Sequence, residues 1–202
     1  MKYVVFDLGG VLIDWNPRHL YRKLLSDEDM EKFLSEVATG PWNEQMDEGK
    51  PFEEGIRELS LRFPNQAKLI RLYFERWPEM LRGDIPGTVA ILEDLHRQRF
   101  PLYALTNWSS ETFAFAKERF DFLQRFRGIV VSGVERVKKP DPRIFEILLS
   151  RYELDPADGI YIDDVEKNVH AAKTLGLDGI LFEGPEALTI ELERRGLPVR
   201  RL

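Results

Sequence analysis

The sequence predicts an α/β fold, in which a doubly wound parallel sheet contains a helical insertion, and three observations support this. Short apolar runs alternate with patterns of helical period along most of the chain. One stretch, residues 15–82, holds helical patterns without a convincing strand. The length of 202 residues allows one domain, or one domain with an insertion, because domains usually hold about 100–200 residues.

Five short apolar runs are the expected strands. The first, Tyr3-Val4-Val5-Phe6, consists of β-branched and aromatic residues and closes at Asp7 and Gly9-Gly10, which is typical of a strand buried on both faces. The other four runs are bounded by polar residues or glycine, and they lie at Leu102 to Leu105, Ile129 to Val131, Ile160 to Ile162 and Ile180 to Phe182.

Helices are expected around the apolar periodic segments 89–95, 113–116, 144–148 and 165–172. Asp141 followed by Pro142 is a strong start signal, since an aspartate cap and a proline both suit the first turn of a helix. Gly176 is the matching stop. Strands that alternate with helices through short loops indicate a Rossmann-like parallel sheet with right-handed crossovers and helices on both faces.

The insertion is predicted to form a helical cap. Helical patterns occur around residues 20–25, 30–37, 52–61 and 67–77, so we expect a catalytic core of residues 1–14 and 83–202 and a cap of residues 15–82. Because the cap follows the first strand, it is placed over the strand ends as a lid. Its aromatic residues are expected to form the cap core, although one ring could stack on a sugar; they are Trp15, Trp42, Phe52 and Trp77.

Composition excludes several classes of protein. The 29 Lys and Arg against 35 Asp and Glu give a net charge of −6, opposite in sign to that of a typical nucleic-acid-binding protein. The absence of cysteine excludes disulfides, thiolate metal sites and cysteine nucleophiles. No apolar run approaches the length of a membrane span, and the first ten residues do not resemble a signal peptide. We therefore expect a cytoplasmic protein that binds neither nucleic acid nor membrane. Its expected partner, from the site residues given below, is a small phosphorylated metabolite, and a monomer or a homodimer is expected.

Four polar groups end or follow predicted strands. In a parallel sheet the ligand site lies at the carboxyl ends of the strands, so these groups should meet in one crevice. The groups are Asp7, Thr106-Asn107, Lys138-Lys139-Pro140 and Asp163-Asp164.

The chemistry of these residue types explains why they would be gathered. Asp7, Asp163 and Asp164 repel one another in a partly desolvated crevice unless a cation lies among them. Ligands that are all oxygen, without His or Cys, favour Mg²⁺. A phosphate group could complete the metal's coordination, with a lysine and the Thr106 hydroxyl on its remaining oxygens, and Asp7 would then face phosphorus as a nucleophile.

At these residues the sequence resembles the haloacid dehalogenase superfamily of phosphohydrolases, and the resemblance covers the whole chain. Four motifs, in this order, resemble those of the family: Phe6-Asp7-Leu8-Gly9-Gly10-Val11-Leu12, Leu105-Thr106-Asn107, Lys139-Pro140-Asp141-Pro142-Arg143-Ile144-Phe145, and Tyr161-Ile162-Asp163-Asp164 with Asn168.

The resemblance implies a role for each matched residue. Asp7 would be the nucleophile that becomes an aspartyl phosphate, and Lys139 would steady both nucleophile and phosphate, in preference to Lys138. The phosphate would also bind to Thr106 and the amide of Asn107. Asp164 would be a Mg²⁺ ligand together with Asp7, and Asp163 either an alternative ligand or a carboxylate that supports the ligands. The Asp-Leu-Gly motif is also similar to a sugar-phosphate phosphatase branch, so glucose 1-phosphate is a first candidate substrate.

One position departs from the family pattern. Family phosphatases usually carry a second Asp two residues after the nucleophile, as general acid and base, and here that residue is Gly9. The Gly9 carbonyl could still bind Mg²⁺, but it cannot exchange a proton, and losing a general acid commonly costs about 10²–10⁴ in rate. We therefore expect a substrate with an acidic leaving oxygen, or an acid supplied by the substrate or by a carboxylate such as Asp14, Glu44 or Asp47.

Two other functions fit the same residues less well. A haloacid dehalogenase would use Asp7 on a carbon–halogen bond without metal, and the Asp163-Asp164 pair would then be unneeded negative charge beside an anionic substrate. Gly9 also stands where the resemblance would lead to a bulky aromatic residue in a dehalogenase. A binding or regulatory protein with weak catalysis would explain the missing acid.

Overall fold

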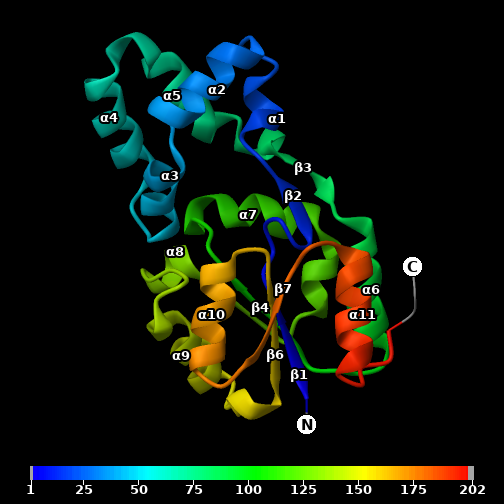
Figure 1. The fold of residues 1–202 in the computed structure, drawn as a ribbon. Helices are drawn as coiled ribbons and strands as arrows, with labels where there is room; N and C mark the ends of the chain where they lie inside the picture. The colour runs from blue at the N-terminus through cyan, green and yellow to red at the C-terminus, as the bar shows by residue number, and fades with distance from the viewer. Residues whose placement is uncertain (1, 200–202) are drawn as a thin grey trace.

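The computed structural model describes residues 2–199, and its core is a five-stranded sheet in which every pairing is parallel. The strand order is β5-β4-β1-β6-β7, so β1 lies at the centre (Figure 1). All five predicted apolar runs are strands of this sheet, which confirms the doubly wound α/β class. Their bounds are β1 Tyr3–Phe6, β4 Leu102–Thr106, β5 Gly128–Val131, β6 Gly159–Asp163 and β7 Asp178–Leu181.

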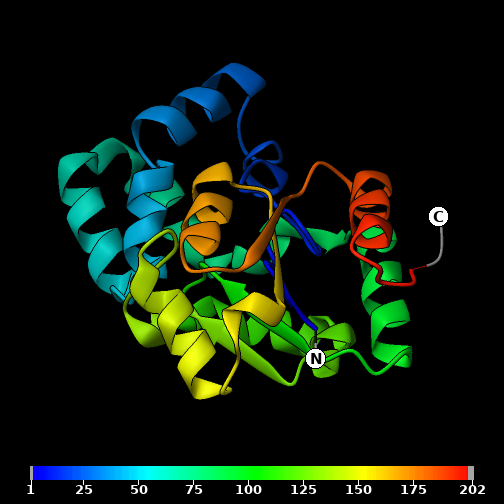
Figure 2. The ribbon, with the colours of Figure 1, turned by 60° about the horizontal axis from the view of Figure 1, so that its bottom comes forward.

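Helices cover both faces of the sheet, and β1 shows why. Val4 and Phe6 belong to the apolar cluster under α6 and α11, while Tyr3 and Val5 belong to the cluster under α9 and α10. Figures 1 and 2 show α6 with α11 on one side and α9 with α10 on the other. The helices of the core are α6 Pro86–Arg97, α7 Ser110–Arg119, α8 Ser132–Glu135, α9 Pro142–Arg151, α10 Glu166–Thr174 and α11 Pro185–Arg194, with 3₁₀ turns η3 Asp121–Arg125 and η4 Pro156–Asp158.

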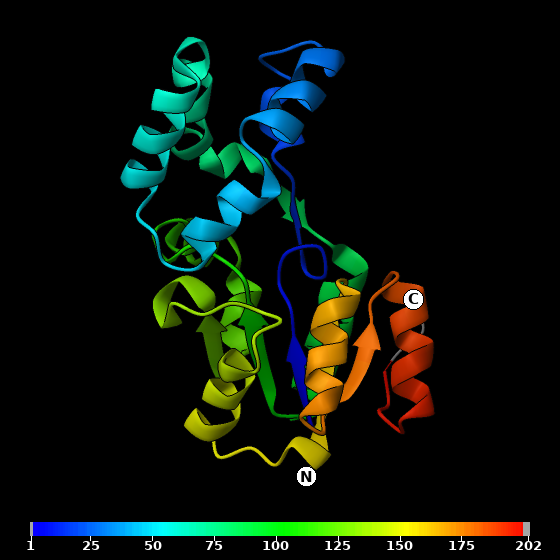
Figure 3. The same cartoon turned by 60° about the vertical axis from the view of Figure 1, so that its left-hand side comes forward.

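The inserted residues form a group of helices beyond the carboxyl ends of the strands (Figures 1 and 3). Four of its regions were expected to be helical, and α3 was not, because Gly40 and Pro41 interrupt the apolar pattern at its start. Thr39 caps α3 by accepting a hydrogen bond from the Trp42 backbone N–H at 3.3 Å. The cap elements are α1 Arg18–Tyr21, α2 Asp27–Glu36, α3 Gly40–Asp47, α4 Phe52–Arg62, η1 Pro64–Gln66, α5 Ala67–Glu75 and η2 Trp77–Met80.

A two-stranded antiparallel ribbon, β2 Ile13–Trp15 and β3 Leu81–Asp84, joins the cap to the core. The prediction that residues 15–82 contain no strand is wrong at both ends of that stretch. Each strand is too short to show a two-residue period, and the two partners lie far apart in the sequence. The proposed division at residues 14/15 and 82/83 falls within these two strands.

Buried aromatic rings form the centre of the cap, as expected for Trp42, Phe52 and Trp77. Trp15, which was expected among them, lies in β2 and is only partly buried, with its ring centroid 5.6 Å from that of Trp77. The Phe52 ring lies 4.8 Å from Phe74 and 5.7 Å from Trp77, measured between ring centroids. Within the described residues 2–199, no helix is long and apolar enough to cross a membrane.

Phe52→Ala is expected to lower the free energy of unfolding by about 3–5 kcal/mol, because it removes a fully buried ring from this cluster. Urea denaturation monitored by tryptophan fluorescence measures the change. Leu61→Ala is the matched control on the same helix, since Leu61 is 79% exposed and its truncation should change stability by less than about 0.5 kcal/mol. Equal losses in the two variants would contradict a cap core centred on Phe52.

Candidate active site

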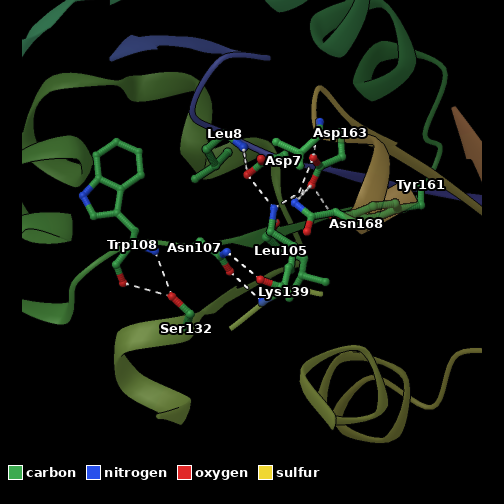
Figure 4. A network of polar contacts seen from close by, with 11 residues as sticks. Asp7, Leu8, Leu105, Asn107, Trp108, Ser132, Lys139, Tyr161, Asp163 and Asn168 are labelled. Carbon is green, nitrogen blue, oxygen red and sulfur yellow. Dashed lines mark hydrogen bonds and ion pairs between the residues drawn. The ribbon is translucent and has the colours of Figure 1, made fainter. Parts of the chain in front are cut away.

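Asp7 lies at the carboxyl end of β1, at the centre of the sheet. β1 pairs with β4 on one side and with β6 on the other, and the chain fills the β4 side of the sheet before it crosses to the β6 side. The strand order therefore reverses at β1, which is the point at which ligands bind in doubly wound sheets. The Asp7 side chain is buried, and its Oδ1 accepts a hydrogen bond from the Leu8 backbone N–H at 2.7 Å (Figure 4). The carboxylate is therefore fixed in orientation.

Lys139 joins Asp7 to Asp163. Its side chain is 1% exposed. The ammonium group lies 3.0 Å from Asp7 Oδ1 and 2.8 Å from Asp163 Oδ2, and it donates a third hydrogen bond to the Leu105 carbonyl at 3.0 Å (Figure 4). Burial alone would lower the pKa of Lys139, but the two carboxylates outweigh burial and raise it. The lysine is thus held in its charged form.

The Asn107 side chain holds the lysine loop in place. Its Nδ2 donates to the Lys139 carbonyl at 3.0 Å, and its Oδ1 accepts from the Lys139 backbone N–H at 2.8 Å. These bonds use the Asn107 side chain and not its backbone amide, which follows the buried Thr106 at the end of β4. Lys138 lies apart, with its ammonium 3.0 Å from Glu48 in the cap.

Asp163 is surrounded by hydrogen-bond donors. Beyond Lys139, its oxygens accept from the Tyr161 hydroxyl, from Asn168 Nδ2 at 3.1 Å and from the Val165 backbone N–H at 2.8 Å. Although burial acts to raise its pKa, Lys139 and these hydrogen bonds lower it overall. With both oxygens engaged by the protein, Asp163 suits the role of positioning Lys139 better than that of binding a metal.

Tyr161 was not predicted as a site residue. The signal was present, because residues two apart on a strand share a face, so Tyr161 and Asp163 necessarily lie on the same side of β6. The contact could not be inferred without knowing that this face holds Lys139.

The acidic residues form a cluster that fits a metal ion. Asp7, Asp163 and Asp164 each offer a carboxylate oxygen within 4.8 Å of the others. Burial and the neighbouring carboxylates raise the pKa of Asp7 to about 7 against the opposing charge of Lys139, and burial also raises the pKa of Asp164. One lysine does not balance three carboxylates. A hard divalent cation such as Mg²⁺ would supply the missing charge to these oxygen ligands.

The glycines after Asp7 shape the loop beside this cluster. Gly10 has φ of +78°, and a Cβ there would lie 2.4 Å from Asp164 Oδ2, so only glycine lets the loop approach that carboxylate. A Cβ on Gly9 would meet nothing within 4 Å. The side-chain position of the missing family aspartate is therefore open space.

A cleft of about 530 Å³ lies between cap and core, and none of the three aspartates of the cluster is among the residues that line it. Asn107 and Val165 line it from the core, and the cap contributes Trp15, Asn43 and Asp47, among others. This volume is within the range of small-molecule sites, about 300–1,000 Å³.

The fold and the site define a capped α/β enzyme centred on buried aspartates and one buried lysine. The chain belongs to the haloacid dehalogenase-like hydrolases, whose family model matches residues 1–176.

Several characterised relatives are phosphatases by name. The chain is 28% identical to the sesquiterpene phosphatase astK of Aspergillus oryzae, over 96% of this chain and 95% of that protein. It is 27% identical to a phosphorylated carbohydrates phosphatase of Thermotoga maritima, over 89% and 84%. It is 29% identical to a glyceraldehyde 3-phosphate phosphatase of Pyrococcus furiosus, over 96% and 85%.

Solved structures of family members share the fold. A haloacid dehalogenase family enzyme of Bacteroides thetaiotaomicron superposes with a TM-score of 0.72 at 22% identity, covering 95% of this chain and 98% of that one. The same enzyme has been solved in complex with magnesium and inorganic phosphate. A dehalogenase superposes with a TM-score of 0.67 at 16% identity, covering 89% and 83%. Because the Bacteroides enzyme and the dehalogenase share this fold, the residues of the site must decide the reaction.

Proposed function

We propose that this hydrolase is a Mg²⁺-dependent phosphatase that hydrolyses a small phosphate monoester through an aspartyl phosphate on Asp7. The observation that supports it most strongly is Lys139, fully buried between Asp7 and Asp163 beside a third carboxylate. This array leaves excess negative charge, which suits a metal-bound dianionic phosphate. The names of the phosphatase relatives and the magnesium and phosphate complex of the Bacteroides enzyme agree with it.

The contacts of Asp7 suggest which atom attacks. Leu8 and Lys139 both bind Oδ1, and among the described residues Oδ2 has no such partner, so Oδ2 would form the bond to phosphorus. Lys139 neutralises Asp7 and, once the phosphoryl group is transferred, would bind its oxygens. Thr106 and the backbone amide of Asn107 would hold the remaining phosphate oxygens. Mg²⁺, held by Asp7, Asp164 and the Gly9 carbonyl, would supply positive charge to the phosphate.

Within this class we favour a sugar phosphate, with glucose 1-phosphate the first to test. The Thermotoga relative named for phosphorylated carbohydrates supports this choice, and Trp15 places an aromatic ring in the wall of the cleft. A panel of phosphorylated metabolites, with phosphate release measured for wild type and Asp7→Asn, tests the function. Halide release from chloroacetate in EDTA would indicate a dehalogenase, and binding of a metabolite without turnover would indicate a regulatory protein.

Removing the metal is expected to abolish phosphate release, and the loss should be reversible. EDTA-treated protein should hydrolyse p-nitrophenyl phosphate at the background rate and recover when Mg²⁺ is added in excess. Asp164→Asn should need more Mg²⁺ for half-maximal activity, since it removes one charged ligand, while its unfolding temperature without metal should not fall. Full activity in EDTA would contradict the role given to the acidic cluster.

A further inference from the structure

A small cavity of about 50 Å³ lies at the side-chain position that Gly9 leaves open. Gly9 and Asn107 line it from the core, and Trp15, Asn43, Asp47 and Trp77 line it from the cap. Asn43 and Asp47 also line the larger cleft, so they stand between the space for a substrate and the space beside Gly9.

Asp47 is a buried carboxylate at the end of α3. Its side chain accepts a hydrogen bond from Asn43 Nδ2 at 3.0 Å, and it faces the Ser109 backbone N–H, on the core loop that follows β4. These contacts hold the cap carboxylate against the part of the core that precedes α7.

Charged and titratable groups surround Asp47 on several elements. Burial raises the pKa of Asp47 to about 7, and the charges of Glu44 and Glu48 add to this rise, while the Ser109 N–H and Lys138 oppose it. The Tyr73 hydroxyl also faces the carboxylate from α5. Asp47 can therefore be present at neutral pH in both its protonated and its ionised form, as an acid and base requires.

Three polar atoms around the cavity lack partners. The indole N–H groups of Trp15 and Trp77 and the Oδ1 of Asn43 are buried and have no hydrogen-bond partner among the described residues. Buried polar groups are almost always paired, so unpaired ones in the lining of a cavity indicate that a polar ligand group or water enters it. Two donors and one acceptor beside Asp47 would suit an oxygen atom of the substrate and a water molecule.

The other carboxylates considered for this role are less suitable. Asp14 Oδ1 already forms a hydrogen bond with His19 Nε2 at 2.8 Å. The Glu44 side chain is 45% exposed and lies 3.7 Å from the Lys138 ammonium.

We propose that Asp47 of the cap is the general acid and base of the reaction, in place of the carboxyl group that Gly9 lacks. This rests on the proposed phosphatase function. As Asp7 bonds to phosphorus and the ester P–O bond breaks, the leaving oxygen takes the proton of Asp47. Water then attacks phosphorus and gives a proton back to Asp47 while the bond to Asp7 breaks, which releases inorganic phosphate and restores both aspartates.

The test compares two leaving groups in Asp47→Asn, a variant that keeps an oxygen acceptor for the Ser109 N–H. An alkyl phosphate has a poor leaving group that needs a proton, so its kcat should fall by about 10²–10⁴-fold. The nitrophenolate of p-nitrophenyl phosphate leaves without a proton, so formation of its aspartyl phosphate, measured as the nitrophenol burst, should stay close to wild type. Glu53→Gln is the control, since it removes a carboxylate of the same cap whose side chain is 80% exposed and which is not among the charges around Asp47, so it should change neither rate.

A rescue variant tests the same idea from the core. Gly9 has open space at its Cβ position and a φ outside the left-handed region, so Gly9→Asp can place a carboxyl group in the cavity. In the Asp47→Asn background it should restore most of the alkyl phosphate rate. A folded double variant no faster than Asp47→Asn would overturn the proposal.

The remaining outcomes separate this inference from the function on which it rests. Equal losses of the burst and of the alkyl phosphate rate in Asp47→Asn, or no loss in either, would overturn the role of Asp47 while leaving the phosphatase intact. A wild-type protein that hydrolyses no phosphate ester would instead overturn the proposed function. Thermal unfolding of each variant shows that the rates refer to folded protein.

Discussion

Asp7→Asn should reduce phosphate release by more than about 10⁴-fold, because it removes the nucleophile while keeping nearly the same side-chain shape. The amide oxygen can still accept the hydrogen bond that Leu8 donates to Asp7 Oδ1. Phosphate release from p-nitrophenyl phosphate at saturating Mg²⁺ measures the loss. A residual rate within tenfold of wild type would assign the nucleophile to another residue.

Stability measurements separate this chemical loss from misfolding. Folding raises the pKa of Asp7 from 3.8 to about 7, so the folded state holds a proton that the unfolded state has released. Without metal, the wild type should therefore lose stability as the pH rises from about 4 to 7. Asp7→Asn does not titrate and should escape this part of the loss, which makes it at least as stable as wild type at pH 8. An unfolding temperature of Asp7→Asn clearly below that of wild type at pH 8 would contradict the raised pKa of Asp7.

The core could be predicted from the sequence because local patterns determine it. Each strand is a continuous apolar run between polar residues, and strands buried on both faces show this pattern even when they are four residues long. Once strands and helices alternate, parallel topology brings the strand ends together. Asp7, Lys139 and Asp163 meet for that reason, although they lie far apart in the sequence.

The cap side of the site could not be predicted, because it depends on long-range packing. Ile13 pairs with Asp84 in the ribbon, and neither segment has a local pattern that indicates a strand. The burial of Asp47 depends on how α3 rests on the loop that contains Ser109, which no spacing along the chain reveals. The sequence therefore offered Asp14, Glu44 and Asp47 as equal candidates, and only their surroundings distinguish them.

Asn107 illustrates the same limit within a predicted motif. The motif places it beside a phosphate, and the sequence does not show that its side chain forms two hydrogen bonds with the backbone of Lys139. Those bonds set the position of the lysine, so the Asn107 side chain shapes the site through the loop that carries Lys139.

Lys139→Met should affect both activity and stability, because the ammonium group is the only cation in contact with Asp7 and Asp163 among the described residues. Removing one partner from a buried ion pair typically costs about 3–5 kcal/mol, since the remaining charges are left uncompensated. Phosphate release should fall by about 10²-fold or more for loss of one charged contact to the transferred group. Urea denaturation and phosphate release measure the two effects.

Lys138→Met is the matched control, because the neighbouring lysine pairs with the cap residues Glu44 and Glu48 near the surface. It should cost no more than about 1 kcal/mol and keep most of the activity. The pH dependence provides a second check on Lys139→Met. Without the ammonium, the pKa values of Asp7 and Asp163 should both rise in the folded state, so stability should recover toward that of wild type as the pH falls and the carboxylates take up protons. If the difference in free energy of unfolding between Lys139→Met and wild type stays constant from pH 8 to 5, the variant is destabilised by lost packing of the lysine stem and not by unbalanced charge.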